Sequence, residues 1–289
     1  MAALCIGSVE HWFQWGRRMS TRLHAMGFPS GWTPQMLRHI DVLSASRSKL
    51  VGAAKGNYRV WRSKDGAELW FHYPRRPLRD RLSSKVDPVM PEPLRPIAVT
   101  PFHRGLSSIP IRIGRYLSAD RLNPLEGSCM AWLPPPVVGG PQQAMVLELA
   151  PYGLQPLRTP PHDTTAQIVC FSHRVWSFDD AAGYIRQTPS NRRIQRGSIS
   201  PITEADVPEV ELTYGQSPIT LGLMTGTVRR AIRYVNPETR DPYYWFLLET
   251  RGGAIDVIAN PAHVDGDISE GHVAQVCGSF LARLAGAAV

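Results

Sequence analysis

Apolar and polar residues alternate over several stretches of this chain, and a two-residue period predicts β-strands. The clearest stretch covers 109–116, where Ile109, Ile111 and Ile113 share one face and Arg112 and Gly114 share the other. Short apolar runs bounded by proline and glycine predict further strands. Strands are expected at 109–116, 144–149, 167–171, 220–234, 243–250, 254–259 and 272–284.

Gly226 lies near the middle of the long strand expected at 220–234. Beyond it, one face carries Val228, Ile232 and Tyr234, and the other carries Arg229, Ala231 and Arg233. A glycine inside a strand permits a bulge or a sharp bend. We therefore expect this strand to serve both sides of a small barrel.

The N-terminal third has a helical pattern followed by a hairpin pattern. Thr33 and Pro34 suit the start of a helix, and Gly52 suits its end. The apolar positions at helical spacing between them are Met36, Leu37, Ile40, Leu43 and Leu50. The tripeptide Lys64-Asp65-Gly66 then separates two alternating runs, at 58–61 and 68–73, which predicts a β-hairpin. A second helix is expected near 177–187, where Ser177 and Asp180 resemble a partial capping box.

These elements predict a mainly β protein, a β-rich α+β chain with several domains. Repeated prolines and arginines between 76 and 96 indicate an extended linker. The expected parts are a poorly ordered tail at 1–19, a basic α+β module at 20–75, the linker at 76–96, a β-rich domain at 97–208 and a small barrel at 209–289.

The last part, about 210–285, resembles the OB-fold, a small Greek-key barrel. It has a long bent strand, a hairpin, a connection and a closing strand. Four strands are clear and a fifth is expected at 209–215, so a different small barrel or a sandwich stays open. The loop 121–126 shares Asn-Pro with the loop 234–238, which is too little to establish a repeat.

The OB resemblance implies a nucleic-acid face on the second and third strands. Tyr243 and Trp245 would stack on bases, and Arg229 and Arg233 would flank them. However, residues 210–289 hold 6 arginines against 8 acidic residues, which weakens attraction to phosphates. The alternative is that Tyr243 and Trp245 lie in the core or contact a partner.

Charge is concentrated at the N-terminal end. Residues 1–96 have a net charge of +9 and residues 97–289 a net charge of −1, for a total of +8. A basic segment on a nearly neutral body favours a polyanionic partner, although a solvated surface is an alternative. The candidate contacts are Arg75, Arg76, Arg79 and Arg81 in the linker, with Lys64 and Trp61 in the hairpin.

Catalytic and metal signals are weak. Cys129 in Gly127-Ser128-Cys129 is similar to the nucleophile segment of papain-like proteases, with His162, His173 and His263 downstream, but a small buried hydrophobe is the alternative. The metal candidates are the Cys170 and His173 pair and the 263–272 segment with its histidines and carboxylates. Phosphate-binding, dinucleotide and hydrolase motifs are absent, so the sequence predicts neither a cofactor nor a metal and favours a non-enzymatic protein, with an enzyme kept as an alternative.

The four cysteines are widely spaced, which favours a reducing, cytoplasmic location. The sequence lacks an 18-residue apolar run and so predicts no membrane span. Either Met1 or Met19 suits the translation start, and the oligomeric state stays open. The first hypothesis is a non-enzymatic intracellular protein that binds nucleic acid through its basic N-terminal region. The alternatives are a protein–protein scaffold or assembly subunit and, third, a thiol or metal-dependent enzyme.

Overall fold

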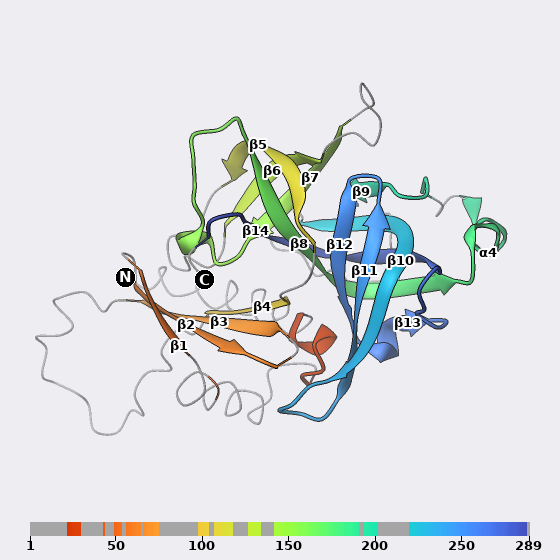
Figure 1. The fold of residues 1–289 in the computed structure, drawn as a ribbon, viewed down its shortest axis with the longest axis horizontal. Coiled ribbons are helices and arrows are strands. Elements are labelled where there is room, and N and C mark those ends of the chain that lie inside the picture. Colours follow the sequence, from red (N-terminus) through yellow and green to blue (C-terminus); the bar gives the residue numbers. More distant parts are fainter. Residues whose placement is uncertain are drawn as a thin grey trace, which may run out of the picture.

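The computed structural model describes residues 22–29, 43, 49–53, 56–64, 66–74, 98–103, 107–117, 127–133, 142–190, 194–201 and 220–287. These residues form a mainly β protein, as predicted (Figure 1). A four-stranded sheet and a ten-stranded sheet contain the strands. The helical elements in the described part are short, and none is long and apolar enough to cross a membrane.

The smaller sheet has the order β1-β2-β3-β4, with every neighbouring pair antiparallel. Its strands are β1 (Lys49–Ala53), β2 (Gly56–Arg62), β3 (Ala67–Pro74) and β4 (Ala98–His103). The predicted hairpin is confirmed as β2 and β3, in which Trp61 lies opposite Leu69. The predicted helix does not extend to Gly52, because residues 49–53 pair with β2 as a strand.

The larger sheet contains all the other strands of the described residues. They are β5 (Ile109–Leu117), β6 (Ser128–Leu133), β7 (Gln143–Leu149), β8 (His162–Phe178), β9 (Ile199–Pro201), β10 (Leu221–Val235), β11 (Pro242–Thr250), β12 (Gly253–Ala259), β13 (Val264–Asp265) and β14 (Val273–Leu284). Two short 3-10 turns, η1 (Tyr152–Leu154) and η4 (Pro261–His263), interrupt the connections. The sequence pattern missed β6 as a strand, although Cys129, Ala131 and Leu133 alternate with partly exposed neighbours.

The larger sheet closes into two five-stranded rings. The first ring runs β5-β6-β7-β14-β8, with β7 and β14 parallel and the other neighbours antiparallel. The second ring runs β10-β11-β12-β8-β14, with β12 and β8 parallel and the other neighbours antiparallel. Both rings therefore share β8 and β14, the pair of strands that crosses the middle of the molecule (Figure 1).

Sharing is possible because β8 and β14 are long. The first residues of β8, from His162 to Ala166, pair with β5, whereas Val169 to Phe171 pair with β12. In β14, residues 273–279 pair with β10, and Leu281 and Ala282 pair with β7. The fifth strand of the C-terminal ring is thus β8, and residues 209–215 lie outside the described part. The predicted boundary at 208/209 does not separate two sheets, because strands from both sides of it share these rings.

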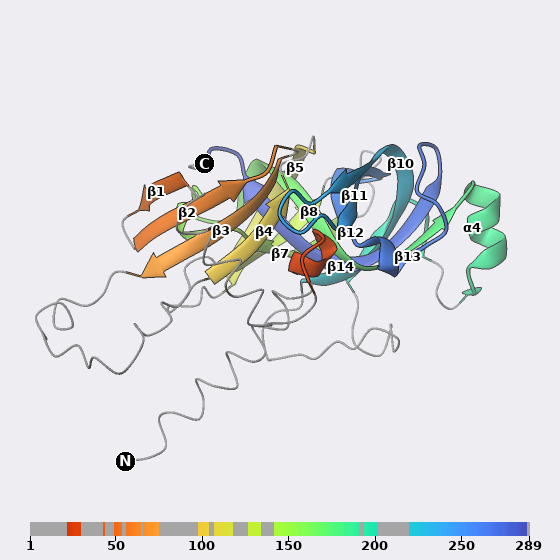
Figure 2. The same cartoon turned by 90° about the horizontal axis from the view of Figure 1, so that it is seen from below.

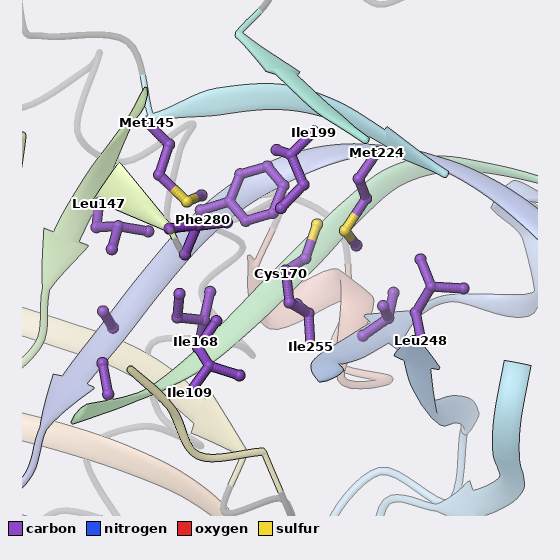
Figure 3. Packing of buried hydrophobic residues seen from close by; sticks show 14 of the residues in the cluster. Ile109, Met145, Leu147, Ile168, Cys170, Ile199, Met224, Leu248, Ile255 and Phe280 are labelled. Carbon is purple, nitrogen blue, oxygen red and sulfur yellow. The ribbon is translucent and has the colours of Figure 1, made fainter. Parts of the chain in front are cut away.

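One apolar core fills both rings. Its inward residues come from the first ring, the second ring and the shared strands. Figure 3 shows Cys170 of β8 and Phe280 of β14 between a group that includes Met145 and Leu147 and a group that includes Met224 and Leu248. The two rings therefore depend on each other for burial, because a shared strand contributes side chains to both.

The predicted bend at Gly226 is confirmed. The strand β10 pairs with β14 as far as Thr227 and with β11 from Thr227 onward, with a bulge between Val228 and Arg230. A Cβ atom at position 226 would lie 2.2 Å from the backbone oxygen of Glu249. The glycine is required because the backbone of β11 approaches so closely.

The helix α4 (Ala181–Gln187) lies at the far end of β8, within the predicted 177–187 region (Figure 1). Asp180 is its N-cap, and its side chain accepts a hydrogen bond from the backbone N–H of Gly183 at 2.6 Å. Ser177 is not part of this cap, since its hydroxyl donates to the backbone oxygen of Asp267.

The smaller sheet packs on the outer surface of the rings (Figure 2). A second apolar cluster joins buried residues of this sheet and of the segment 22–28 to outward residues of β8, β11, β12 and β14. Buried ion pairs link the same parts: Arg22 with Glu148, and Arg283 with Glu68. The N-terminal sheet is therefore integral to the folded protein.

Candidate nucleic-acid interface

The aromatic face predicted on the second ring is covered. Tyr243 and Trp245 are 1% and 3% exposed, and both belong to the cluster formed with the segment 22–28 and the smaller sheet. The indole N–H of Trp245 donates to the buried carboxylate of Asp256 at 2.9 Å. Neither ring can stack on a base in this arrangement, so the prediction for these two residues is corrected to a packing role.

The segment 22–28 is held on this face by hydrogen bonds to its backbone. Asn236 donates to the carbonyl of Met26 at 2.8 Å, and Thr239 donates to the carbonyl of Gly27 at 2.6 Å. Asn260 donates to the carbonyl of His24 at 3.0 Å. The loop between β10 and β11, which would border a ligand in an OB-fold, therefore contacts the protein's own chain.

The other predicted contacts are dispersed. Trp61 is buried in the cluster beneath the smaller sheet, so it cannot act as a stacking surface. Lys64 and Arg233 are exposed. Arg229 is exposed and forms an ion pair with Glu249, and the guanidinium of Arg230 lies 5.9 Å from the centre of the Trp245 ring. Arg75, Arg76, Arg79 and Arg81 lie outside the described residues.

An open face with exposed arginine side chains and a partly exposed tryptophan lies on the first ring instead. The outward residues of β6 are Ser128, Met130 and Trp132, since Cys129, Ala131 and Leu133 point into the core. Met130 and Trp132 are both partly exposed. On the neighbouring strand β5, Arg112 lies opposite Trp132 and Arg115 lies opposite Met130. Both arginines are exposed.

A bulge in β5 places the two arginines on one face. Residues 112 and 115 would point to opposite sides of a regular strand, but the register shifts between Ile113 and Arg115. Gly114 at the bulge also makes room for the tryptophan. A Cβ atom at position 114 would lie 1.8 Å from Cζ3 of Trp132. The indole ring therefore lies directly against the backbone of β5 at Gly114, on the face that also carries Arg112 and Arg115.

The outer surface of β7 continues this face with smaller side chains. Ala144 lies opposite Trp132 and Val146 lies opposite Met130, and both are at least partly exposed. On the other side of β5, the exposed carboxylate of Asp163 on β8 lies opposite Arg112. We refer to Arg112, Arg115, Met130, Trp132 and Val146 as the β5–β7 face. It combines an aromatic ring, two cations and apolar surface.

The sequence contained a signal for this face. The alternation over 109–116 separated Arg112 and Gly114 from the inward isoleucines. The sequence did not predict the strand β6, because all its residues after Ser128 are apolar and no alternation of polar and apolar residues marks it. Position 115 was also unpredictable, since only the bulge brings Arg115 to the same side as Arg112.

The thiol and metal candidates lack the required chemistry. Burial raises the pKa of Cys129 to about 12, whereas a nucleophilic cysteine needs a lowered pKa. Cys170 points into the core, and the ring Nε2 of His173 lies 3.1 Å from the hydroxyl of Ser279. Asp265 is bonded to Arg174. Among the described residues, no three histidine, cysteine or acidic side chains form a group that could hold a metal ion.

Comparison with known proteins finds no matching family model, no matching curated protein and no matching solved structure. The strand order and the side chains of the β5–β7 face are therefore the features that bear on function.

Proposed function

We propose that this protein binds nucleic acid without catalysing a reaction, and that the β5–β7 face is its principal contact. The observation that carries the proposal is the partly exposed ring of Trp132, which lies against Gly114 on the same face as Arg112 and Arg115. An exposed aromatic ring stacks on bases of any identity, and arginine side chains bind phosphate oxygens.

The strand order supports the same proposal. We assign each ring as an OB-like barrel, because each has a three-strand antiparallel meander whose last strand is parallel to one of the two closing strands. In the first ring, β6 and β7 take the positions of the second and third OB strands. Ligands of OB-folds bind on the outer face of those strands. In the first ring, the open β5–β7 face lies at this ligand-binding position. In the second ring, the covered face with Tyr243 and Trp245 lies there.

The basic N-terminal region contributes a second proposed contact through Arg75, Arg76, Arg79 and Arg81. These side chains would neutralise phosphates and add affinity that does not depend on base stacking. Residues 97–289 have a net charge of −1, so they do not attract phosphates over long range. The basic N-terminal region would supply that attraction.

The test is fluorescence anisotropy with a labelled 12-nucleotide DNA strand at about 50 and 200 mM salt, where phosphate contacts differ in strength. Trp132→Ala should weaken binding about 5- to 150-fold, since a stacked base contributes about 1–3 kcal/mol. Arg112→Glu with Arg115→Glu should also reduce the salt dependence, by about 1.4 in log–log slope for two lost contacts to a single strand.

The matched control is Arg186→Glu, an exposed arginine in the last turn of α4, away from the β5–β7 face. It should leave affinity within about twofold, because it removes a charge but no contact of the proposed site. Absence of measurable binding at about 50 mM salt would reject nucleic acid as the ligand. Equal losses in Trp132→Ala and Arg186→Glu would reject the β5–β7 face.

A protein partner is the second candidate function, and one observation favours it. The face of the second ring already binds a segment of the protein itself, residues 22–28. The side chains of Asn236, Thr239 and Asn260 donate hydrogen bonds to backbone carbonyls of this segment. The β5–β7 face of a similar ring would then bind a segment of another protein. Isolation of the tagged protein from its host with nuclease treatment distinguishes these functions. A protein partner should remain bound after the treatment, and it should be lost from the Trp132→Ala variant.

A further inference from the structure

A polar pocket lies beside the β5–β7 face, on the outer surface of the same ring. It has a volume of about 320 Å³ and is lined by Ser108, Thr165, Gln167, Arg283 and the turn 285–287, together with Ala166 and Leu284. This volume is at the lower end of the range for small-molecule sites. The pocket therefore suits one small ring system.

The strand registers make the pocket continuous with the β5–β7 face. Arg112 lies opposite Trp132 on one side and opposite Asp163 on the other, and Pro110 lies opposite Thr165. Gln167 lies opposite Arg283 on β14. Strand geometry places the pocket about 13 Å along β5 from Trp132 and about 10 Å across the sheet. A strand of a few nucleotides spans this distance, within the site size of about 4–16 nucleotides for an OB-fold.

The floor of the pocket is polar and its charges are balanced. The guanidinium of Arg283 forms a buried ion pair with Glu68 and stacks 6.0 Å from the centre of the Trp70 ring. Gln167 donates through Nε2 to Asp256 at 3.1 Å, and Ser107 donates to the same carboxylate at 2.5 Å. These bonds fix the side chains at the pocket. Because the arginine is already neutralised, the pocket favours an uncharged hydrogen-bonding group over a phosphate.

We propose that this pocket holds a single nucleobase of a strand whose neighbouring bases lie on the β5–β7 face, and that it gives the protein a base preference. The proposal rests on the proposed function and adds selectivity to it. Stacking on Trp132 is tolerant of sequence, whereas a pocket with a fixed amide and two hydroxyl groups discriminates between the donor and acceptor patterns of the bases.

The experiment compares dissociation constants for 12-nucleotide strands of dA, dC and dT. The wild-type protein should prefer one of the three by at least fivefold. Thr165→Trp should fill the pocket and reduce this preference to within twofold, with binding retained. Thr165 is exposed, and tryptophan is well accepted in strands, so the fold should survive. Thr159→Trp, an exposed threonine outside the pocket lining, is the matched control and should keep the preference.

Two further variants make the outcome decisive. Ser108→Tyr fills the same pocket from the side of β5 and should also reduce the base preference. If thermal unfolding shows that one of the two variants is unstable, the other still tests the pocket. Trp132→Ala should weaken all three strands alike and keep their order. Equal binding of the three strands by the wild-type protein, or a preference unchanged by both fillings, overturns the pocket proposal alone. Failure of every strand to bind overturns the proposed function as well.

Discussion

At the scale of single residues, the burial of His173 makes the stability of the fold depend on pH. Burial, with the positive charge of Arg22 and the neighbouring His263, lowers the pKa of His173 from 6.5 to about 4. Its ring Nε2 lies 3.1 Å from Ser279 Oγ, and His263 Nδ1 lies 3.0 Å from the carbonyl of His173. The pKa of His263 is also lowered, by burial and by the nearby His24. This histidine group lies where the segment 22–28 meets β8.

We predict that acidification destabilises the protein through His173. The unfolded chain binds a proton with a pKa near 6.5 and the folded chain only near 4, so the unfolded state holds more protons between these values. Stability is complete above about pH 6.5 and falls as the pH drops towards 4. The loss is about 3 kcal/mol for this residue alone. Urea unfolding at pH 7.5, 6 and 5 measures the part of this loss that occurs by pH 5, about 2 kcal/mol.

His173→Gln is the variant that isolates this effect, since glutamine keeps a polar end near Ser279 but does not titrate. Its unfolding free energy should change less between pH 7.5 and 5 than that of the wild-type protein. The control is His272→Gln, which removes a partly exposed histidine bonded to the backbone oxygen of Asp267. An equal pH dependence in wild type and His173→Gln would contradict the assignment to His173.

At the scale of elements, the strands of a barrel change partners at glycines. Gly226 directly precedes Thr227, where β10 passes from β14 to β11, and Gly114 lies at the bulge where the pairing of β5 with β8 ends and its pairing with β6 continues. The two glycines differ in what they touch. A side chain at 226 meets the backbone of Glu249, whereas a side chain at 114 meets the partly exposed ring of Trp132.

We therefore predict that Gly226→Ala is strongly destabilising. Its Cβ atom would lie 2.2 Å from a backbone oxygen that cannot move without opening the β10–β11 pair. The cost should be about 1–3 kcal/mol or more, as for other overpacked sites, and chemical denaturation measures it. Gly271→Ala is the control, because no atom lies within 4 Å of its Cβ position. It measures the cost of a positive φ alone, about 1 kcal/mol. A smaller loss in Gly226→Ala than in Gly271→Ala would contradict this explanation.

Local patterns predicted most of these elements, and their failures have physical reasons. The hairpin, the bend at Gly226 and the strands after 220 follow from alternation and turn residues, which depend on neighbours in sequence. Residues 49–53 form a strand despite a helical pattern, since pairing with β2 overrides local preference. The double use of β8 and β14 could not be predicted, because their partners are distant in sequence. The segment 22–28 and the smaller sheet, which are also distant in sequence, cover Trp245, whereas Trp132 stays partly exposed.

At the scale of the molecule, a buried polar network joins the smaller sheet to the rings. Glu68 is fully buried and accepts hydrogen bonds from Arg62 at 2.9 Å and from the indole of Trp70 at 3.0 Å, in addition to its ion pair with Arg283. Burial alone would raise the pKa of Glu68, but the charge of Arg283 and these bonds outweigh it, so the pKa is lowered. Asp256 differs, since burial raises its pKa despite bonds from Ser107, Gln167 and Trp245.

The ion pair between Glu68 and Arg283 should hold the two sheets in one cooperative unit. Glu68→Gln leaves a buried guanidinium without its counter-charge, and such changes cost about 3–5 kcal/mol. Arg283→Met added to Glu68→Gln should recover part of this loss, because it removes the uncompensated charge. The control is Glu249→Gln, which breaks the exposed pair with Arg229 and should cost no more than about 1 kcal/mol. Chemical denaturation followed by tryptophan fluorescence and by circular dichroism measures these effects. If the sheets form one unit, both probes shift together in Glu68→Gln, whereas separate transitions would show that the smaller sheet unfolds independently of the rings.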